Sequence, residues 1–452
     1  MEVIDSTQSL DTGKSGRLLF SYALPSIVSS LTVAFYNVVD RIFIGHHGAD
    51  ADSAMAMAGL SLTFPLLNLL QAFGTLIGVG AATRMSIVLG MKDVRWAERI
   101  LAHSLALNVA TQLIVIVLSM LYLDPILQWF GGSEKTIPYA AEYLYYVIPG
   151  SLFTSLCFNH AGLLRASGYP TKSMSVILVG AGLNIVLDPI FINVLDMGIK
   201  GAALATLLSM IVSAAYAMQY FFRPSAYVRY KRFAFHPRFF IVRNIVAIGL
   251  SPFLINAMSS VVNMVTNQLL AKHGGDIAVG ANSVLSGYFI IVVMIIFGLC
   301  QGMQPIVGYN YGAGNMKRVK EVYRLTIKAA TVVTGVSFAA AMLIPRQMAM
   351  AFTNDEELLN ISTLAIRIGF LVFAPVGFQV VTGQFFQAIG KVKQSIFLSM
   401  SRQAVFLLPP LFLGAYLWGL TGVFVALPVS DFMASIIAAV MIYRFKFEKA
   451  NV

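Results

Sequence analysis

The sequence LRASGYPTKSMSVILVGAGLNIVLDPIFI, from Leu164 to Ile192, contains the features that recur along the whole chain. Residues 171–193 are mainly apolar and reach the length, about 20 residues, at which an α-helix crosses a lipid bilayer. The basic residues Arg165 and Lys172 flank the start of this run. Two polar residues, Asn184 and Asp188, lie one helical turn apart inside it. The stretch therefore predicts a membrane-spanning helix with a polar face.

The composition of the whole chain supports the same environment. Hydrophobic residues make up 58% of the 452 residues and charged residues only 11%, and the mean hydropathy is +0.78. A soluble domain carries about 25% charged residues, so this chain cannot build a water-exposed surface and lipid must be its main solvent. The formal net charge of +11 is spread over many short loops. This pattern favours the positive-inside rule over a nucleic-acid-binding patch.

Hydropathy predicts an all-α integral membrane protein with twelve transmembrane helices. The expected segments are 18–44, 55–83, 97–121, 139–164, 171–193, 199–222, 243–271, 277–309, 320–344, 361–388, 394–416 and 420–444. Basic clusters follow the even-numbered segments and precede the first, whereas the alternate loops hold isolated lysines. Both termini are therefore expected in the cytoplasm.

The two halves of the sequence resemble each other. LPSIVSSLTVAFYNVVDRIFIGHHG, from Leu24, aligns with LSPFLINAMSSVVNMVTNQLLAKHGG, from Leu250, so that Pro25 meets Pro252 and Asp40 meets Asn267. Six spans return the chain to its starting side, so the repeats are parallel. The sequence predicts two pseudo-symmetric six-helix bundles, an N-terminal lobe at 1–222 and a C-terminal lobe at 243–452, joined by a cytoplasmic linker at 223–242. Paired bundles of this kind are common among secondary transporters.

A few polar residues stand out because ionisable groups in hydrocarbon are costly. Asp40, Asn184, Asp188 and Thr206 offer only oxygen ligands, which suit a hard cation or a shared proton rather than zinc or copper. The alternative is that they only pair with nearby residues for stability. Arg402 and Asp431 lie at compatible depths in the last two spans. They are expected to form a structural ion pair, and a second titrating site is the alternative.

The first and seventh spans each have a stripe of polar residues along one face, and the two stripes match. Ser29, Val33, Tyr36 and Asp40 share one face of the first span. The seventh has Asn256, Ser260, Asn263 and Asn267 at the equivalent positions. These faces are expected to line the bundle interior or a wet cavity, although interhelical hydrogen bonding alone is the open alternative. The C-terminal lobe has no carboxylate equivalent to Asp40 or Asp188.

The sequence contains no motif for a nucleotide or a metal that could drive transport. Gly13-Lys14-Ser15 echoes a phosphate-binding loop but lacks its glycine five positions earlier and precedes no strand. No metal-binding pair of cysteines or HExxH motif occurs. An ion gradient or passive transport is therefore expected, with neither a nucleotide nor a cofactor other than the coupling ion.

The chain resembles the multidrug and toxic compound extrusion (MATE) family over nearly its whole length. The resemblance is most specific in Leu164–Ile192 and in GIKGAALATLLSMIVS, Gly198–Ser213, and it points to the DinF-type prokaryotic branch. In that branch an N-lobe cation site uses residues that match Asp40, Asn184, Asp188 and Thr206 here, with Na⁺ or H⁺ as the coupling ion. The resemblance also assigns Tyr36, Met210 and, through a looser alignment, Asn159 to the N-lobe cavity. It implies the MATE-type fold and antiport of amphipathic, often cationic drugs.

Two other functions are alternatives to this one. A lipid-linked oligosaccharide flippase of the same superfamily is expected to have a basic cavity, whereas the candidate cavity residues here are acidic or neutral. A membrane enzyme would need clustered catalytic residues, and only isolated histidines occur, so no catalytic residue is assigned. We expect a monomer in the cytoplasmic membrane of a prokaryote, with small-molecule drugs and lipid as partners and no nucleic acid.

Overall fold

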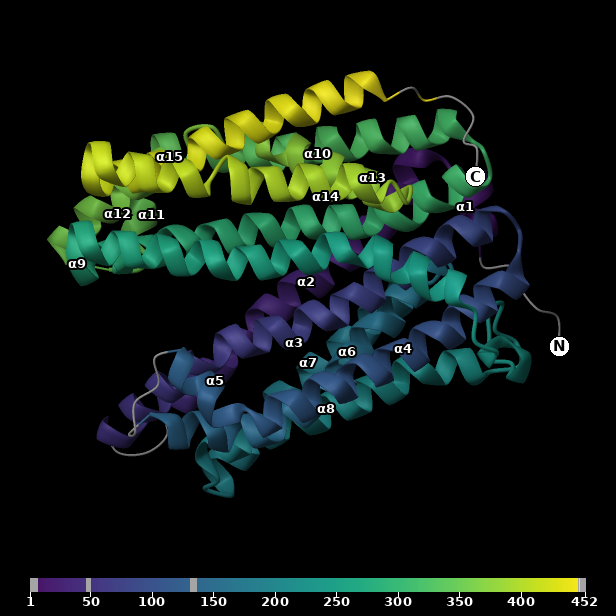
Figure 1. The fold of residues 1–452 in the computed structure, drawn as a ribbon, viewed down its shortest axis with the longest axis horizontal. Helices are drawn as coiled ribbons and strands as arrows, with labels where there is room; N and C mark the ends of the chain where they lie inside the picture. Colours follow the sequence, from purple (N-terminus) through teal and green to yellow (C-terminus); the bar gives the residue numbers. More distant parts are fainter. Residues whose placement is uncertain (1–6, 46–49, 131–135, 354, 446, 448–452) are drawn as a thin grey trace. The chain divides into compact units, whose positions relative to one another are not determined.

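The computed structural model describes residues 7–45, 50–130, 136–353, 355–445 and 447; for residues 37–45, 50–62 and 276 it describes the backbone but not the side chain. This part of the chain is almost entirely helical, as the sequence predicts (Figure 1). The first half contains α1 (Gln8–Thr12), α2 (Ser15–Gly45), α3 (Asp50–Gly90), α4 (Val94–Leu121), α5 (Leu123–Trp129), α6 (Ile137–Ala166), α7 (Pro170–Pro189), the π-helix η1 (Ile190–Val194), α8 (Gly198–Phe222) and the 3₁₀-helix η2 (Arg232–Phe235). The second half contains α9 (Phe239–Gly312), α10 (Met316–Leu343), α11 (Pro345–Met350), α12 (Glu356–Gly369), α13 (Val376–Ala388), α14 (Val392–Met400), the π-helix η3 (Ser401–Val405) and α15 (Leu408–Arg444).

Ten stretches in the described part of the chain are long and apolar enough to cross a membrane. The expected span at 361–388 is divided between α12 and α13, because residues 370–375 between them are not helical. The expected spans at 394–416 and 420–444 both fall in one stretch, Val392–Arg444. The count of twelve crossings therefore stays a prediction.

Glycines interrupt the helices α9 and α15. Gly275 in α9 and Gly419 in α15 have positive φ angles, 63° and 56°, which glycine adopts without steric cost. Gly414 and Gly422 approach so closely that a Cβ on either would collide with the backbone of the other. Residues eight apart in a straight helix would be about 12 Å apart, so the chain folds back at Gly419.

The chain forms two compact units that exchange a segment. One unit contains Met1–Gly13 and Val28–Phe253, and the other contains Lys14–Ile27 and Leu254–Val452. The start of α2 thus belongs to the second unit and the start of α9 to the first. Two of the three changes of unit, those after Ile27 and Phe253, fall within three residues of Pro25 or Pro252, the prolines that the internal repeat aligns. The sequence-predicted lobes contain no such exchange.

Glycines hold each exchanged segment against its unit. In the first unit, a Cβ on Gly249 of α9 would collide with the backbone at Leu76 of α3, and one on Gly80 of α3 with Ile245. In the second unit, Gly298 and Gly302 of α9 lie against the backbone of α2 at Ile27 and Ala23, at 2.5 and 2.6 Å from an ideal Cβ. Small residues allow helix backbones to approach closely, and the van der Waals packing that results helps helices to associate in lipid.

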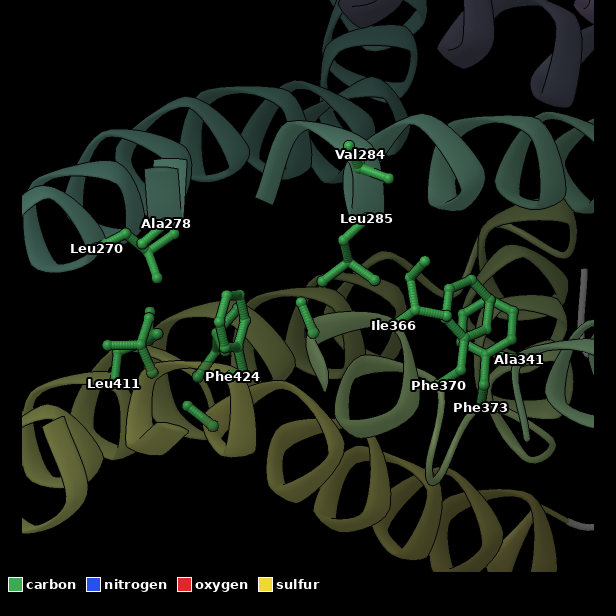
Figure 2. Close-up of a cluster of buried hydrophobic side chains, with 14 of the residues drawn as sticks. Leu270, Ala278, Val284, Leu285, Ala341, Ile366, Phe370, Phe373, Leu411 and Phe424 are labelled. Carbon is green, nitrogen blue, oxygen red and sulfur yellow. The ribbon is translucent and has the colours of Figure 1, made fainter. Parts of the chain in front are cut away.

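Each unit has its own apolar core. In the second unit, residues of α9 pack against α12 and α15; Figure 2 shows Leu285 facing Ile366, and Leu270 facing Leu411. The ring centroids of Phe370 and Phe373 are 4.6 Å apart, a normal distance for an aromatic pair. In the first unit, a cluster around Leu66, Leu144 and neighbouring residues joins α3 to α6.

The connection between α8 and α9 is packed against the first unit. Ala226, Val228 and Ala234 are buried, and Lys231 forms a 2.8 Å ion pair with Glu98 of α4. The backbone N–H of Arg238 donates to Nε2 of His103 at 3.0 Å. The linker predicted at 223–242 is thus a docked segment, and α9 begins inside it at Phe239.

Candidate functional site

The centre of the candidate site is the C-terminal end of α7. Asn184 and Asp188 are both fully buried, at 0% exposure. The Asn184 Nδ2 donates to Oδ1 of Asp188 at 3.2 Å, as the four-residue spacing predicts. The π-helix η1 begins two residues after Asp188, and single π-helical turns are frequent at functional sites.

Thr206 of α8 completes a three-residue oxygen cluster. The same Asn184 Nδ2 also donates to Oγ1 of Thr206 at 3.4 Å. Because both contacts use the amide nitrogen, the side-chain oxygen of Asn184 points elsewhere. That oxygen is buried and has no hydrogen-bond partner in the described part of the chain. The cluster therefore supplies a carboxylate, an amide oxygen and a hydroxyl, which are ligands for a hard cation.

The fourth predicted member of the site, Asp40, lies in α2, but its side chain is outside the described residues. Tyr36, one turn earlier, is half-buried. The structure thus brings together Asn184, Asp188 and Thr206, and the contribution of Asp40 stays a prediction.

The other predicted residues of the N-lobe cavity are enclosed by helix packing. Met210 of α8 is buried, and its methyl carbon lies 3.7 Å from the Cβ position of Gly180 in α7. Asn159 of α6 is fully buried beside Gly78 of α3. Neither polar atom of the Asn159 amide has a hydrogen-bond partner in the described part of the chain.

The polar stripe of α9 is partly accessible, and its place in a cavity stays a prediction. Asn256 and Ser260 are half-buried, and Asn263 and Asn267 are exposed. Asn267 accepts a hydrogen bond from Nδ2 of Asn282 at 3.3 Å. Asn282 was not among the predicted residues. It lies beyond the reversal at Gly275, where helical periodicity cannot show that it faces Asn267.

Arg402 and Asp431 form an ion pair in the second unit. Nε and Nη2 of Arg402 lie 2.9 and 2.8 Å from Oδ1 of Asp431. Arg402 is in the π-helix η3, and its backbone carbonyl accepts from the Ser430 hydroxyl at 2.9 Å. Of the two alternatives left by the sequence, these contacts favour the structural ion pair.

A buried polar ladder between α4 and α6 was not predicted. Asn108 Nδ2 donates to Oγ of Ser155 at 2.9 Å, and the Ser151 hydroxyl donates to Oε1 of Gln112 at 3.3 Å. All four residues are buried. Asn108 and Gln112 are four residues apart in α4, and Ser151 and Ser155 are four residues apart in α6. This spacing, which puts both residues on one helix face, was the signal in the sequence.

Sequence comparison relates the chain to named exporters. The MatE family model matches residues 25–190 and 252–413, once in each half. These matches begin at Pro25 and Pro252, the prolines that the internal repeat aligns. Multidrug export protein MepA of Staphylococcus aureus (strain MSSA476) is 29% identical over 432 residues, which cover 95% of this chain and 94% of that protein. Multidrug export protein MepA of Staphylococcus haemolyticus (strain JCSC1435) is 27% identical with the same coverage.

Structural comparison gives the same result. An outward-facing multidrug resistance MATE family transporter of the MOP superfamily matches with a TM-score of 0.90 at 25% identity, over 98% of both chains. A MOP superfamily transporter from Pyrococcus furiosus matches equally well, with a TM-score of 0.90 at 25% identity and the same coverage. These matches confirm the predicted fold class, and with the apolar helices they show a multi-pass membrane protein. The chain therefore belongs to the MatE family, the multidrug and toxic compound extrusion transporters.

Proposed function

We propose that this chain is a secondary active multidrug exporter that moves amphipathic, often cationic compounds out of the cell in exchange for H⁺ or Na⁺. The observation that carries the proposal is the buried cluster of Asn184, Asp188 and Thr206 within one unit of a MatE-family chain. The similarity to proteins named multidrug export protein supports the class of substrate.

The cluster offers a physical basis for coupling. A proton or Na⁺ that binds Asp188 removes its negative charge, and a cationic drug loses that attraction. Binding of one ligand then weakens binding of the other, and linkage makes this effect reciprocal. Asn184 and Thr206 position the carboxylate and supply further oxygens. Asp40 is proposed as the second carboxylate of the same site.

The location of the basic loops supports an orientation with both termini in the cytoplasm. In a prokaryote the protein would then lie in the cytoplasmic membrane and export drugs from the cell. We propose that the monomer is the functional unit, because each chain contains both repeats.

The test is transport in proteoliposomes with separately imposed H⁺ and Na⁺ gradients. A fluorescent lipophilic cation such as ethidium serves as the substrate. We expect movement of the dye against its own gradient when one of the two ion gradients is present, and collapse of that movement when the gradient is dissipated. Equal dye movement with and without any ion gradient would contradict antiport. Translocation of a lipid-linked oligosaccharide in place of the dye would support the flippase alternative.

A further inference from the structure

A small cavity lies where the start of α7 meets the ends of α6 and α8 in the first unit. Its walls include Lys172 and Val176 of α7 and Tyr216, Gln219, Tyr220 and Arg223 at the end of α8 or just after it. Its volume is about 60 Å³, which is space for roughly four or five water molecules and enough for a phosphate group. The cavity is separate from Asn184, Asp188 and Thr206, none of which lines it.

The charges around this cavity favour an anion. Lys172 and Arg223 are both basic, and none of the lining residues is acidic. The Lys172 ammonium lies 4.1 Å from the ring centroid of Tyr169 and 4.6 Å from that of Tyr220, so two aromatic faces hold it in place. Lys172 is also in the first turn of α7, where the helix dipole disfavours a cation and favours an anion.

A buried hydroxyl also belongs to the wall of this cavity. Tyr220 lines the cavity and is only 8% exposed. Its hydroxyl lies within hydrogen-bonding reach of the Tyr169 side chain and of the backbone at Tyr227. An anion in the cavity would compete for this hydroxyl, because a charged oxygen is a stronger acceptor than either of these neutral groups.

The surface that leads to the cavity identifies what carries the anion. Leu208, Val212, Tyr216, Gln219 and Arg223 follow one another at intervals of four, four, three and four residues, so they lie on one face of α8 and its end. Leu208, Val212 and Tyr216 are exposed large hydrophobic residues. The face therefore changes from apolar to aromatic to polar and finally to cationic, as the polarity of a phospholipid changes from acyl chain to headgroup.

We propose that this cavity, here called the α7–α8 headgroup site, binds the phosphate of an anionic phospholipid. Lys172 and Arg223 attract the phosphate, the Tyr220 hydroxyl donates a hydrogen bond to it, and the acyl chain follows the exposed face of α8. Basic pockets between membrane helices are suited to anionic headgroups on the cytoplasmic side. The proposal rests on the orientation proposed above, which places this end of α7 on the cytoplasmic side, and does not depend on the drug or coupling ion.

The experiment measures lipid binding to the purified full-length protein in detergent. Phosphatidylglycerol and phosphatidylcholine are titrated separately, and bound lipid is counted by native mass spectrometry while the melting temperature is recorded. We expect phosphatidylglycerol to bind more tightly and to raise the melting temperature. The double variant Lys172→Gln/Arg223→Gln should bind phosphatidylglycerol about tenfold more weakly. The charge-matched control Arg95→Gln/Arg324→Gln, at two exposed basic residues outside the cavity, should bind it as the wild type does.

Two further measurements keep the assignment specific. Tyr220→Phe preserves the aromatic ring and removes only the hydroxyl, so it should weaken phosphatidylglycerol binding severalfold. This variant decides the question even if the double variant does not fold. Inorganic phosphate at matched concentration should not protect the protein. Wild-type lipid binding by both sets of cavity variants would overturn the site, and equal protection by inorganic phosphate would overturn the lipid assignment.

Discussion

The Tyr230 hydroxyl donates a hydrogen bond to Nε2 of His160 at 2.7 Å, and this bond ties the segment between the two repeats to the interior of α6. Nδ1 of His160 lies 2.8 Å from the carbonyl oxygen of Leu156, which can only accept, so Nδ1 carries the proton and Nε2 is the acceptor in the neutral ring. Burial raises the pKa of Tyr230, which keeps its hydroxyl protonated as the donor. The segment after α8 is therefore part of the fold of the first unit.

Removal of this hydroxyl should destabilise the protein. Tyr230→Phe leaves Nε2 of the fully buried His160 without its partner, and we expect a loss of about 1–3 kcal/mol in the free energy of unfolding. Thermal unfolding in detergent measures the change. Tyr443→Phe is the matched control, because Tyr443 is 90% exposed and should tolerate the same change. Equal stability of the two variants would show that the docked segment is not held by this bond.

The second prediction concerns the oxygen cluster. Asp188→Asn should reduce gradient-driven dye efflux to background while the protein still inserts and purifies, because an amide cannot bind and release a proton at accessible pH. Thr206→Val, which removes one oxygen, should weaken the dependence on the coupling ion. Glu142→Gln is the control, since Glu142 forms only a partly exposed ion pair with Lys200. Full efflux by Asp188→Asn would reject the assignment.

The ion pair of the second unit should contribute to stability and not to coupling. Arg402→Gln leaves the carboxylate of Asp431, at 3% exposure, without a cation, and we expect a loss of about 3–5 kcal/mol. The double variant Arg402→Gln/Asp431→Asn should lose much less than the sum of the single changes, as a double-mutant cycle would show. A stable Asp431→Asn variant that transports dye without an ion gradient would instead identify a titrating site.

The polar stripe of α9 should determine which drugs are carried. Asn267→Ala removes the partner of Asn282, so Asn267→Ala and Asn282→Ala should change drug preference in the same direction and by a few fold, the effect of one hydrogen bond of about 1 kcal/mol. Efflux of several drugs in resistant cells measures the preference. The ion dependence should remain that of the wild type, because the proposed coupling site lies in the N-terminal lobe, and its loss in either variant would contradict that assignment.

Orientation can be tested at the docked segment. Ser225→Cys should not react with a membrane-impermeant maleimide in intact cells and should react after the membrane is opened. Cys157 and Cys300 are 1% and 2% exposed, so the wild type serves as the background control. Labelling from outside would show that the segment is not cytoplasmic.

The sequence by itself determined the features that depend on composition and on periodicity within one helix. Too few charges for a soluble surface indicated a membrane protein, and apolar runs located its helices. The spacing of Asn184 and Asp188 predicted their contact, because residues four apart share a helix face whatever surrounds them. The alignment of Pro25 with Pro252 showed the repeat at which the family matches also begin.

The tertiary structure alone decided which helix faces meet. The contact of Asn184 with Thr206, the choice of an ion pair for Arg402 and Asp431, and the bond between Tyr230 and His160 join residues 22 to 70 positions apart. The start of α2, up to Ile27, and the start of α9, up to Phe253, are exchanged between the units. This exchange depends on glycines that allow two backbones to touch. Periodicity describes one helix at a time, and these contacts arise from close packing between helices, which no local pattern specifies.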